Sequence, residues 1–297
     1  IIGQVSAPIG DFIGFAHALQ DARISMERLN DIHAQEDEEY DICNKLSLLP
    51  ENGTITVRDL TYSYSGAERD YAIKNLSLDI PEGKVTAIVG ESGSGKTTLI
   101  KLLQGFYKPN SGTIKVGGIS LDCINPHLWR KSTGSVMQES YIFSDTIAKN
   151  IALSTDEVDV KRLYDSALLA NADEFISALP LGYNTRIGME GSGVSQGQRQ
   201  RLLIARAIYK NPKYLFFDEA TNSLDATNER IIMENLQKIF QNRTVVISAH
   251  RLSTVMNADN IVVMKKGEIV EQGTHSELVA LRGHYYTLVK NQLELGK

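Results

Sequence analysis

The sequence has little of what defines several protein classes. It contains two cysteines among 297 residues, Cys43 and Cys123, far apart and without metal-type spacing. That scarcity excludes a disulfide scaffold and indicates a reducing, cytosolic compartment. No run of about 18 uninterrupted apolar residues occurs, so no membrane-spanning segment is expected within the sequence. The net charge of −5 shows no basic excess, which argues against a nucleic-acid partner.

The remaining composition is that of an ordinary globular protein. Hydrophobic residues make up 42% of the chain and charged residues 23%, enough for a large core. The chain starts at Ile1 without methionine or a basic leader, and we expect it to be a fragment of something longer.

Residues 1–35 are expected to lack a core of their own, with one long helix over 9–33. Over 9–33, apolar residues recur at steps of three and four, which gives a single apolar seam. A linker is expected over 36–52, with the acidic stretch "EDEEY" at 36–40 and the turn "PENG" at its end.

From Thr54 the pattern changes to strands that alternate with helices, and this predicts an α/β fold with a largely parallel sheet. Residues 53–297 are expected to form one domain, in which about 139–212 is helix-rich and forms a subdomain. The expected strands are 54–65, 72–80, 84–90, 213–218, 244–250 and 260–273. The expected helices are 96–106, 157–178, 198–209 and 227–240.

The clearest chemical motif is "GESGSGKTT" at 90–98, a phosphate-binding loop between a strand and a helix. Its backbone N–H groups and the helix N-terminus can hold phosphate oxygens. Lys96 can reach the β- and γ-phosphates, and the Thr97 hydroxyl can ligate Mg²⁺. The nucleotide-binding residues predicted here are Gly90, Glu91, Ser92, Gly93, Ser94, Gly95, Lys96, Thr97 and Thr98.

Two carboxylates end the apolar strand in "YLFFDE" at 214–219. Ligands of open α/β sheets bind at the carboxyl ends of strands. Asp218 suits the Mg²⁺ shell, and Glu219 could orient and deprotonate an attacking water. Alone, the pair could equally be a favourable start to a helix. The phosphate-binding loop upstream favours the catalytic interpretation.

The stretch "GSGVSQGQRQR" at 191–201 contains a capping box, in which Ser195 caps a helix and Gln198 bonds back. A cap alone does not require the glycines around it. Small residues at a helix N-terminus allow close approach to an anion, and we expect Ser195 to face a phosphate.

Six motifs in order resemble the nucleotide-binding domain of an ATP-binding cassette (ABC) transporter. They are the phosphate-binding loop, "VMQES" at 136–140, "VSQGQ" at 194–198, "YLFFDE" at 214–219, "SLD" at 223–225 and "SAHRLST" at 248–254. The resemblance covers about 53–290. It implies a P-loop NTPase (RecA-like) core with an antiparallel β subdomain and an inserted α-helical subdomain. It also implies ATP and Mg²⁺ as cofactors.

The resemblance assigns roles that the residues alone leave open. Gln138 matches the glutamine that senses Mg²⁺ and the γ-phosphate, and His250 matches the switch histidine; we place both with Glu219 in the catalytic set. Tyr64 matches the aromatic that stacks on adenine, with Tyr62 and Tyr71 as nearby competitors. Four further positions match the signature and D-loop contacts to the nucleotide of the opposite subunit: Ser195, Gly197, Gln198 and Asp225.

Three positions depart from the family pattern. The usual Leu-Ser-Gly-Gly-Gln signature has Val194 in place of its leucine and Gln196 in place of its first glycine, and we expect the Gln196 side chain to point away from the nucleotide. Upstream, Arg186 stands where many exporters carry an acid.

The sequence therefore predicts the ATP-hydrolysing motor of a homodimeric exporter, with two ATP molecules held head to tail between the subunits. "SMERLNDI" at 25–32 resembles the junction between the last transmembrane helix and the ATPase in exporter half-transporters, which implies that residues 1–35 are the end of that helix and the connecting helix. We expect the missing membrane domain to belong to the same polypeptide, at the cytoplasmic face of the plasma (inner) membrane. The strongest similarity is to peptidase-containing exporters of bacteriocin-like peptides. Alternatives are an exporter of lipid or small molecules and a soluble ABC clamp.

Overall fold

The computed structural model describes residues 2–34, 45–65, 70–153, 157–188, 193–220, 226–249 and 255–295. The chain divides into two compact units, residues 1–45 and 46–297. This division falls inside the predicted linker, of which residues 36–44 lie outside the described part.

The first unit is one long helix, α1 (Ile2–His33), which begins well before the expected residue 9. Its described apolar side chains are exposed within this chain, among them Phe12, Phe15 and Met26. Arg23 and Glu27 form an ion pair at 2.9 Å along the helix surface. Among the described residues, no helix is both long enough and apolar enough to cross a bilayer.

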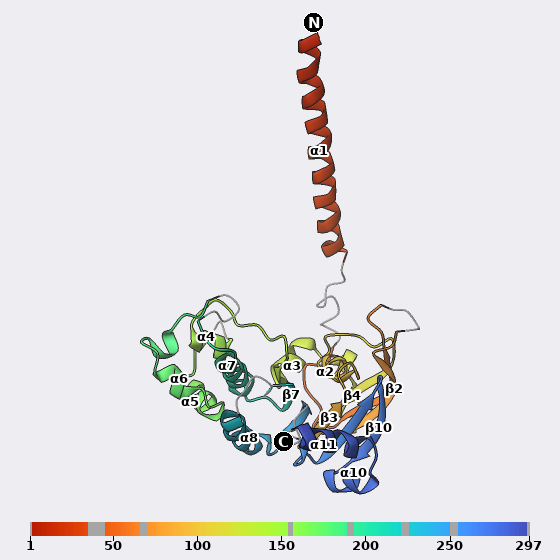
Figure 1. The fold of residues 1–297 in the computed structure, drawn as a ribbon, viewed down its shortest axis with the longest axis vertical. Helices are drawn as coiled ribbons and strands as arrows, with labels where there is room; N and C mark the ends of the chain where they lie inside the picture. Colours follow the sequence, from red (N-terminus) through yellow and green to blue (C-terminus); the bar gives the residue numbers. More distant parts are fainter. Residues whose placement is uncertain are drawn as a thin grey trace. The chain divides into compact units, whose positions relative to one another are not determined.

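The second unit contains two sheets (Figure 1). The six-stranded sheet has the order β10-β9-β3-β8-β7-β6, and only its β10–β9 pair is antiparallel. The other sheet is antiparallel, with the order β2-β1-β4-β5. The strands are β1 (Ile55–Tyr62), β2 (Ile73–Ile80), β3 (Val85–Gly90), β4 (Ser111–Val116), β5 (Ile119–Ser120), β6 (Thr133–Val136), β7 (Tyr214–Asp218), β8 (Thr244–Ser248), β9 (Asn260–Lys265) and β10 (Glu268–Gly273).

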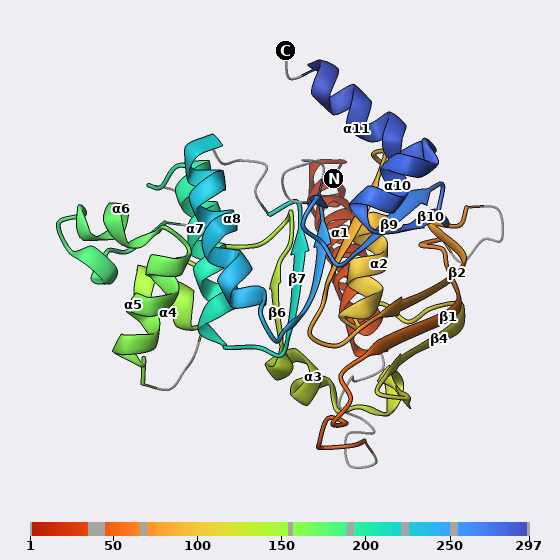
Figure 2. The same cartoon turned by 90° about the horizontal axis from the view of Figure 1, so that it is seen from below.

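Nine helices accompany these strands in the described part of the second unit. They are α2 (Lys96–Leu103), α3 (Pro126–Ser132), α4 (Ile147–Ala152), α5 (Val160–Leu169), α6 (Asp173–Ser177), α7 (Gln196–Tyr209), α8 (Ala226–Phe240), α10 (His275–Leu281) and α11 (His284–Leu295). Two short 3₁₀ helices, η2 (Leu121–Cys123) and η3 (Gly182–Asn184), complete the described helical segments. Helices α4 to α7 gather beyond the β6 edge of the sheet, whereas the antiparallel strands lie at the other side (Figure 2).

The central strands are apolar throughout because both faces of the six-stranded sheet are buried. Along β7, Leu215 and Phe217 pack into one core with α7 and α8, and the alternate residues Tyr214 and Phe216 pack into a second core. The second core also contains α2 and the antiparallel sheet. The predicted α/β class with its two subdomains is confirmed, and α2 is fixed between two layers.

Two expected elements are each divided in the structure. The helix expected over 157–178 breaks after Leu169, where Asn171 adopts a left-handed φ of 52°, and resumes as α6. The strand expected over 260–273 is the hairpin β9–β10, which turns at Lys266 and Gly267. In both places a residue with positive φ ends the regular backbone, which asparagine and glycine tolerate best.

Candidate nucleotide-binding and catalytic site

The carboxyl ends of four neighbouring parallel strands meet at one edge of the sheet. In spatial order these are β3, β8, β7 and β6, and Asp218 lies directly beside Ser248 in the β7–β8 register. β3 leads into the phosphate-binding loop, β7 ends at Asp218, and Gln138 follows β6. Motifs far apart in the sequence therefore converge because parallel strands end on the same side.

The phosphate-binding loop is held by close backbone packing. Gly95 has φ 104°, and a Cβ there would lie 2.6 Å from the carbonyl oxygen of Ala72. The Gly267 N–H donates to the carbonyl of Ser94 at 3.0 Å. Only glycine fits position 95, since both its backbone conformation and its neighbour exclude a side chain.

Lys96 lies inside this loop, 6% exposed. Its ammonium donates to the carbonyl oxygens of Gly90 at 2.9 Å and Glu91 at 3.0 Å. Burial lowers the pKa of Lys96, while the carboxylates of Glu219 and Asp218 act in the opposite direction. The side chain is thus a desolvated cation at the centre of a ring of backbone groups, as a phosphate-binding lysine must be.

Asp218 is the most unusual group of the site. It is fully buried, and within the described part of the chain neither carboxylate oxygen accepts a hydrogen bond. Burial raises the pKa of Asp218, although the nearby Thr97 and Ser248 hydroxyls pull it down. An orphaned buried carboxylate is costly unless a ligand completes it.

The donors fit Mg²⁺, which binds through one or two protein oxygens together with substrate phosphates. The described residues contain no cluster of three His, Cys, Asp or Glu side chains that could hold a metal by themselves. Asp218 and Thr97 could therefore supply part of a Mg²⁺ shell, with the remaining ligands coming from substrate phosphates.

Glu219 follows immediately and has a left-handed φ of 52°. Its N–H donates to the carbonyl of Ser248 at 3.1 Å, and its carbonyl accepts from Gln200 Nε2 at 3.3 Å. Both sides of the residue are therefore fixed, one by β8 and the other by α7.

A cavity of about 490 Å³ unites most of the predicted nucleotide contacts. Its lining residues are Tyr64, Ala72, Ser92, Gly93, Gly95, Lys96, Thr97, Thr98, Gln138 and Glu219. Glu91 is exposed, and Ser94 is buried with a hydroxyl that has no hydrogen-bond partner among the described residues; neither lines the cavity. Gly90 contributes its carbonyl to Lys96.

Tyr64 is the aromatic residue among those lining residues. It is 58% exposed, and its hydroxyl lies 3.1 Å from that of Thr98. Its competitor Tyr62 is buried in β1 and meets Tyr64 edge to face at 5.1 Å. Tyr71 is half-buried and does not line the cavity.

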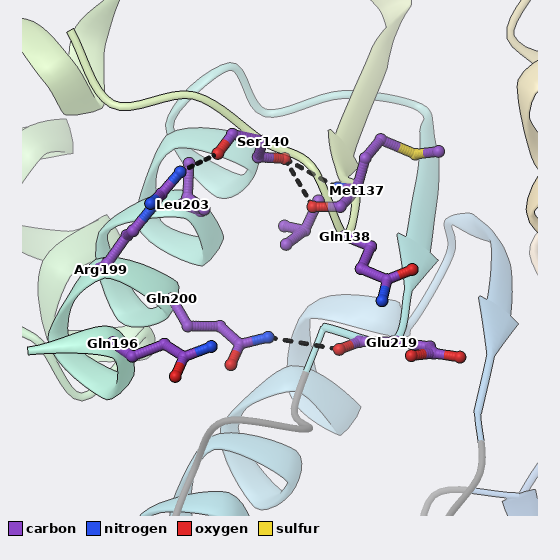
Figure 3. A pocket seen from close by; sticks show the side chains of 9 residues that line it. Met137, Gln138, Ser140, Gln196, Arg199, Gln200, Leu203 and Glu219 are labelled. Carbon is purple, nitrogen blue, oxygen red and sulfur yellow. Dashed lines mark hydrogen bonds between the residues drawn. The ribbon is translucent and has the colours of Figure 1, made fainter. Parts of the chain in front are cut away.

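Gln138 lines a second cavity as well, of about 300 Å³, together with Glu219 and the first turns of α7 (Figure 3). It lies in a tight turn in which the Ser140 hydroxyl donates to the Met137 carbonyl at 2.8 Å and accepts from its N–H at 2.9 Å. Arg199 of α7 donates to the Ser140 carbonyl at 2.7 Å.

The predicted capping box is present at the start of α7. Ser195 Oγ accepts from the Gln198 N–H at 3.2 Å, and Gln198 Oε1 accepts from the Ser195 N–H at 2.9 Å. Ser195 is exposed, Gly197 is half-buried, and neither lines the cavities described above. Gln196, expected to point away from a nucleotide, lies along the second cavity of its own chain (Figure 3).

Three further residues singled out from the sequence are His250, Asp225 and Arg186. His250 and Asp225 lie outside the described residues, as does all of "SLD". Arg186 pairs with Thr146 in a short β-bridge. The pKa of the neighbouring Asp145 is lowered chiefly by the Thr146 N–H, and to a smaller extent by Lys149 and Arg186.

No role is predicted from the sequence for two residues of this site, Arg199 and Gln200, although both lie in the stretch at 191–201. They follow the signature motif directly, and Gln200 lies one helical turn after Gln196, on the same face of α7. That spacing is visible in the sequence, but the groups they bind are not.

Comparison with known proteins places this arrangement in a family. Residues 73–222 match the family model described as "ABC transporter". "Leukotoxin translocation ATP-binding protein LktB" of Mannheimia haemolytica is 45% identical over 293 residues, covering 99% of this chain and 41% of that protein. The proteins of the same name from Bibersteinia trehalosi and Mannheimia glucosida match to the same extent. The chain thus spans about two fifths of the length of these relatives.

A solved structure agrees with this match. It is described as "Structure of a bacterial Atm1-family ABC exporter with ATP bound" and is 33% identical, with a TM-score of 0.85. The similarity covers 93% of this chain and 48% of that one. The family match, the fold and the convergence of the motifs at one sheet edge lead to the same conclusion: this chain belongs to the ABC transporter family.

Proposed function

We propose that the chain is the ATP-hydrolysing motor of an ABC exporter that works as a head-to-tail pair. The observation that carries the proposal is the cavity in which the loop around Lys96, the Thr97 hydroxyl, Gln138 and Glu219 meet beside the orphaned Asp218. Lys96 and the loop N–H groups complement the negative charge of a nucleoside triphosphate, and the side-chain oxygens suit its bound cation.

Each residue then has a distinct task. The loop N–H groups and Lys96 bind the phosphates, and Tyr64 lies against the adenine. Asp218 and Thr97, with Gln138 nearby, would hold Mg²⁺, which neutralises phosphate charge when bound. Glu219 orients the attacking water and accepts its proton. His250 is proposed as the group that contacts the γ-phosphate.

A second copy completes the site in this proposal. Ser195 is exposed and does not line the cavity with Lys96 in its own chain. A two-fold pair would bring Ser195, Gly197 and Gln198 of one chain, with Asp225 at the interface, to the nucleotide of the other. ATP would then favour the closed pair, and hydrolysis would release it.

The proposed cargo is a polypeptide. The relatives named for leukotoxin translocation match 99% of the chain, α1 included. Their greater length leaves room for the membrane domain, which we place in the same polypeptide at the inner membrane with this chain on its cytoplasmic face. A peptidase domain and a bacteriocin-like cargo are finer forms of the same proposal. An exporter of lipid or small molecules is the alternative, and the similarity to the Atm1-family ABC exporter shows that the match is not confined to the leukotoxin relatives.

The test of the motor is Glu219→Gln. We expect it to bind ATP and to pair in its presence, with kcat for hydrolysis reduced at least a hundredfold, since a carboxamide cannot accept the proton. The matched control is Glu234→Gln, an exposed carboxylate on α8, which should hydrolyse ATP at the wild-type rate. Unchanged hydrolysis in Glu219→Gln would remove Glu219 from its role.

A test of the cargo requires the complete transporter, reconstituted in vesicles. ATP-dependent uptake of a labelled unfolded polypeptide, with none of a labelled lipid or small molecule, supports the proposal. The reverse result overturns it.

A further inference from the structure

Helix α7 reaches the catalytic side of the site at Gln200, two residues after the signature motif ends. It begins at the cap Ser195, and Gln200 lies about 7.5 Å further along the helix axis. From there the Gln200 amide donates to the Glu219 carbonyl at 3.3 Å (Figure 3). The backbone of the proposed catalytic base is therefore bound by the helix whose N-terminus is directed, in the proposed pair, at the other nucleotide.

The conformation of Glu219 makes this contact consequential. A left-handed φ of 52° is strained for a non-glycine residue, so the surroundings must hold it there. Among the described residues, the bond from its N–H to the Ser248 carbonyl and the bond from the Gln200 amide to its own carbonyl contribute to this. Loss of the Gln200 bond would leave the Glu219–Ala220 peptide freer to rotate, and that rotation would move the carboxylate relative to Lys96 and Thr97, with which it lines the cavity.

The same turn of α7 also holds the other side of the site. Arg199 donates to the Ser140 carbonyl in the turn that carries Gln138. Gln138 and Glu219 both line the cavity of about 300 Å³ against which this turn packs. A displacement of the first turns of α7 would thus reach Glu219 directly through Gln200, and the turn that carries Gln138 through Arg199 and Ser140.

We infer that Gln200 is a positioning residue, which holds Glu219 in its left-handed conformation and couples the two nucleotide sites of the pair. This rests on the proposed function, because it takes Glu219 as the base and Ser195 as the contact to the partner's nucleotide. Engagement of Ser195 fixes the start of α7, α7 carries Gln200, and Gln200 fixes the base of its own chain. Each site then hydrolyses fastest when the other is filled.

The test is steady-state hydrolysis by residues 1–297, with ATP affinity measured separately by equilibrium binding. Gln200→Met keeps the length of the side chain and removes the donor. We expect kcat to fall about tenfold, as one lost hydrogen bond and a displaced base predict. The KM and the dissociation constant should stay within twofold, and the Hill coefficient should fall from above 1 to 1. Gln237→Met, the same change at an exposed position of α8, is the control and should behave as wild type.

A second variant separates positioning from packing. Gln200→Glu has the shape of the native side chain but donates only when protonated. The ratio of its kcat to that of Gln200→Met should therefore rise as the pH falls, whereas a packing role predicts a constant ratio. A wild-type kcat and Hill coefficient in Gln200→Met overturn the inference alone. A wild-type chain that binds ATP but does not hydrolyse it overturns the proposed function and the inference with it.

Discussion

The phosphate-binding loop and the start of α7 are both glycine-rich turns into a helix, but the surroundings of their glycines differ. In the loop, the backbone of Ala72 excludes any side chain at Gly95, and Lys96 binds the loop carbonyls. At α7, Gly193 has almost the same backbone φ, 101° against 104°, yet a Cβ there would meet no described atom within 4 Å.

Under the proposed function, Gly95 belongs to a site built inside one chain, and Gly193 belongs to half of a site. The glycine at 95 is required by its own fold. The glycine at 193 is required only by its backbone conformation, and the space beside it is open. Open space at a capped helix N-terminus is what the approach of an anion requires, and within this chain nothing described fills it. The proposed second copy would account for that space.

The matched pair Gly95→Ala and Gly193→Ala breaks or sharpens this comparison and carries the largest expected effect. Both changes force alanine into a left-handed backbone, at about 1 kcal/mol or more each. Gly95→Ala also creates a backbone clash that the packed loop cannot relieve. We expect the free energy of unfolding to fall by about 3–4 kcal/mol at position 95 and by about 1 kcal/mol at position 193, measured by urea titration. Equal losses would contradict the distinction.

Asp218→Asn gives the next largest effect. Because burial raises the pKa of Asp218, the folded chain binds more protons than the unfolded chain does. Stability must then fall as the pH rises from the unfolded value, near 4, through the raised folded value. The substitution removes the buried charge, so without nucleotide we expect a gain of about 1–2 kcal/mol at pH 7 and a flatter pH profile.

Addition of Mg²⁺ and ATP should make the wild-type chain more stable than Asp218→Asn, the reverse of the order expected without ligand. The wild-type melting temperature should rise on addition, and that of Asp218→Asn should rise much less, in differential scanning fluorimetry. A variant less stable than wild type in the absence of ligand would show that Asp218 has partners that stabilise its charge. Glu51→Gln, an exposed carboxylate, is the control and should leave both values unchanged.

The sequence predicts the parts of this site that depend on local pattern. The phosphate-binding loop needs only a strand, glycines and a helix, and "YLFFDE" needs only an apolar strand that ends in acids. The capping box is equally local, because Ser195 and Gln198 are three residues apart. For each, the physical cause lies within about ten residues, and a single sequence contains it.

The rest depends on contacts between distant segments. Gln200 and Glu219 are separated by 19 residues and by the whole of β7, and Arg199 and Ser140 by 59 residues. Nothing in the local pattern distinguishes Gln200 from an exposed helix residue. The break after Leu169 is not predicted either, since the residues on both sides continue a helical pattern and one left-handed Asn171 interrupts it.

The smallest effect is expected from a comparison of two capping boxes. This comparison also tests most directly whether the start of α7 is half of a nucleotide site. Ser195 with Gln198 caps α7, and Thr274 with Glu277 caps α10 by the same pair of reciprocal bonds. Replacing either cap with alanine should lower the free energy of unfolding by about 1 kcal/mol. Only Ser195→Ala should also weaken ATP-dependent pairing of Glu219→Gln chains, measured by size-exclusion chromatography, because only that hydroxyl would face a partner's phosphate. If both alanine variants are less stable and neither pairs more weakly, Ser195 is a helix cap and nothing more. The second copy must then contact the nucleotide through other groups.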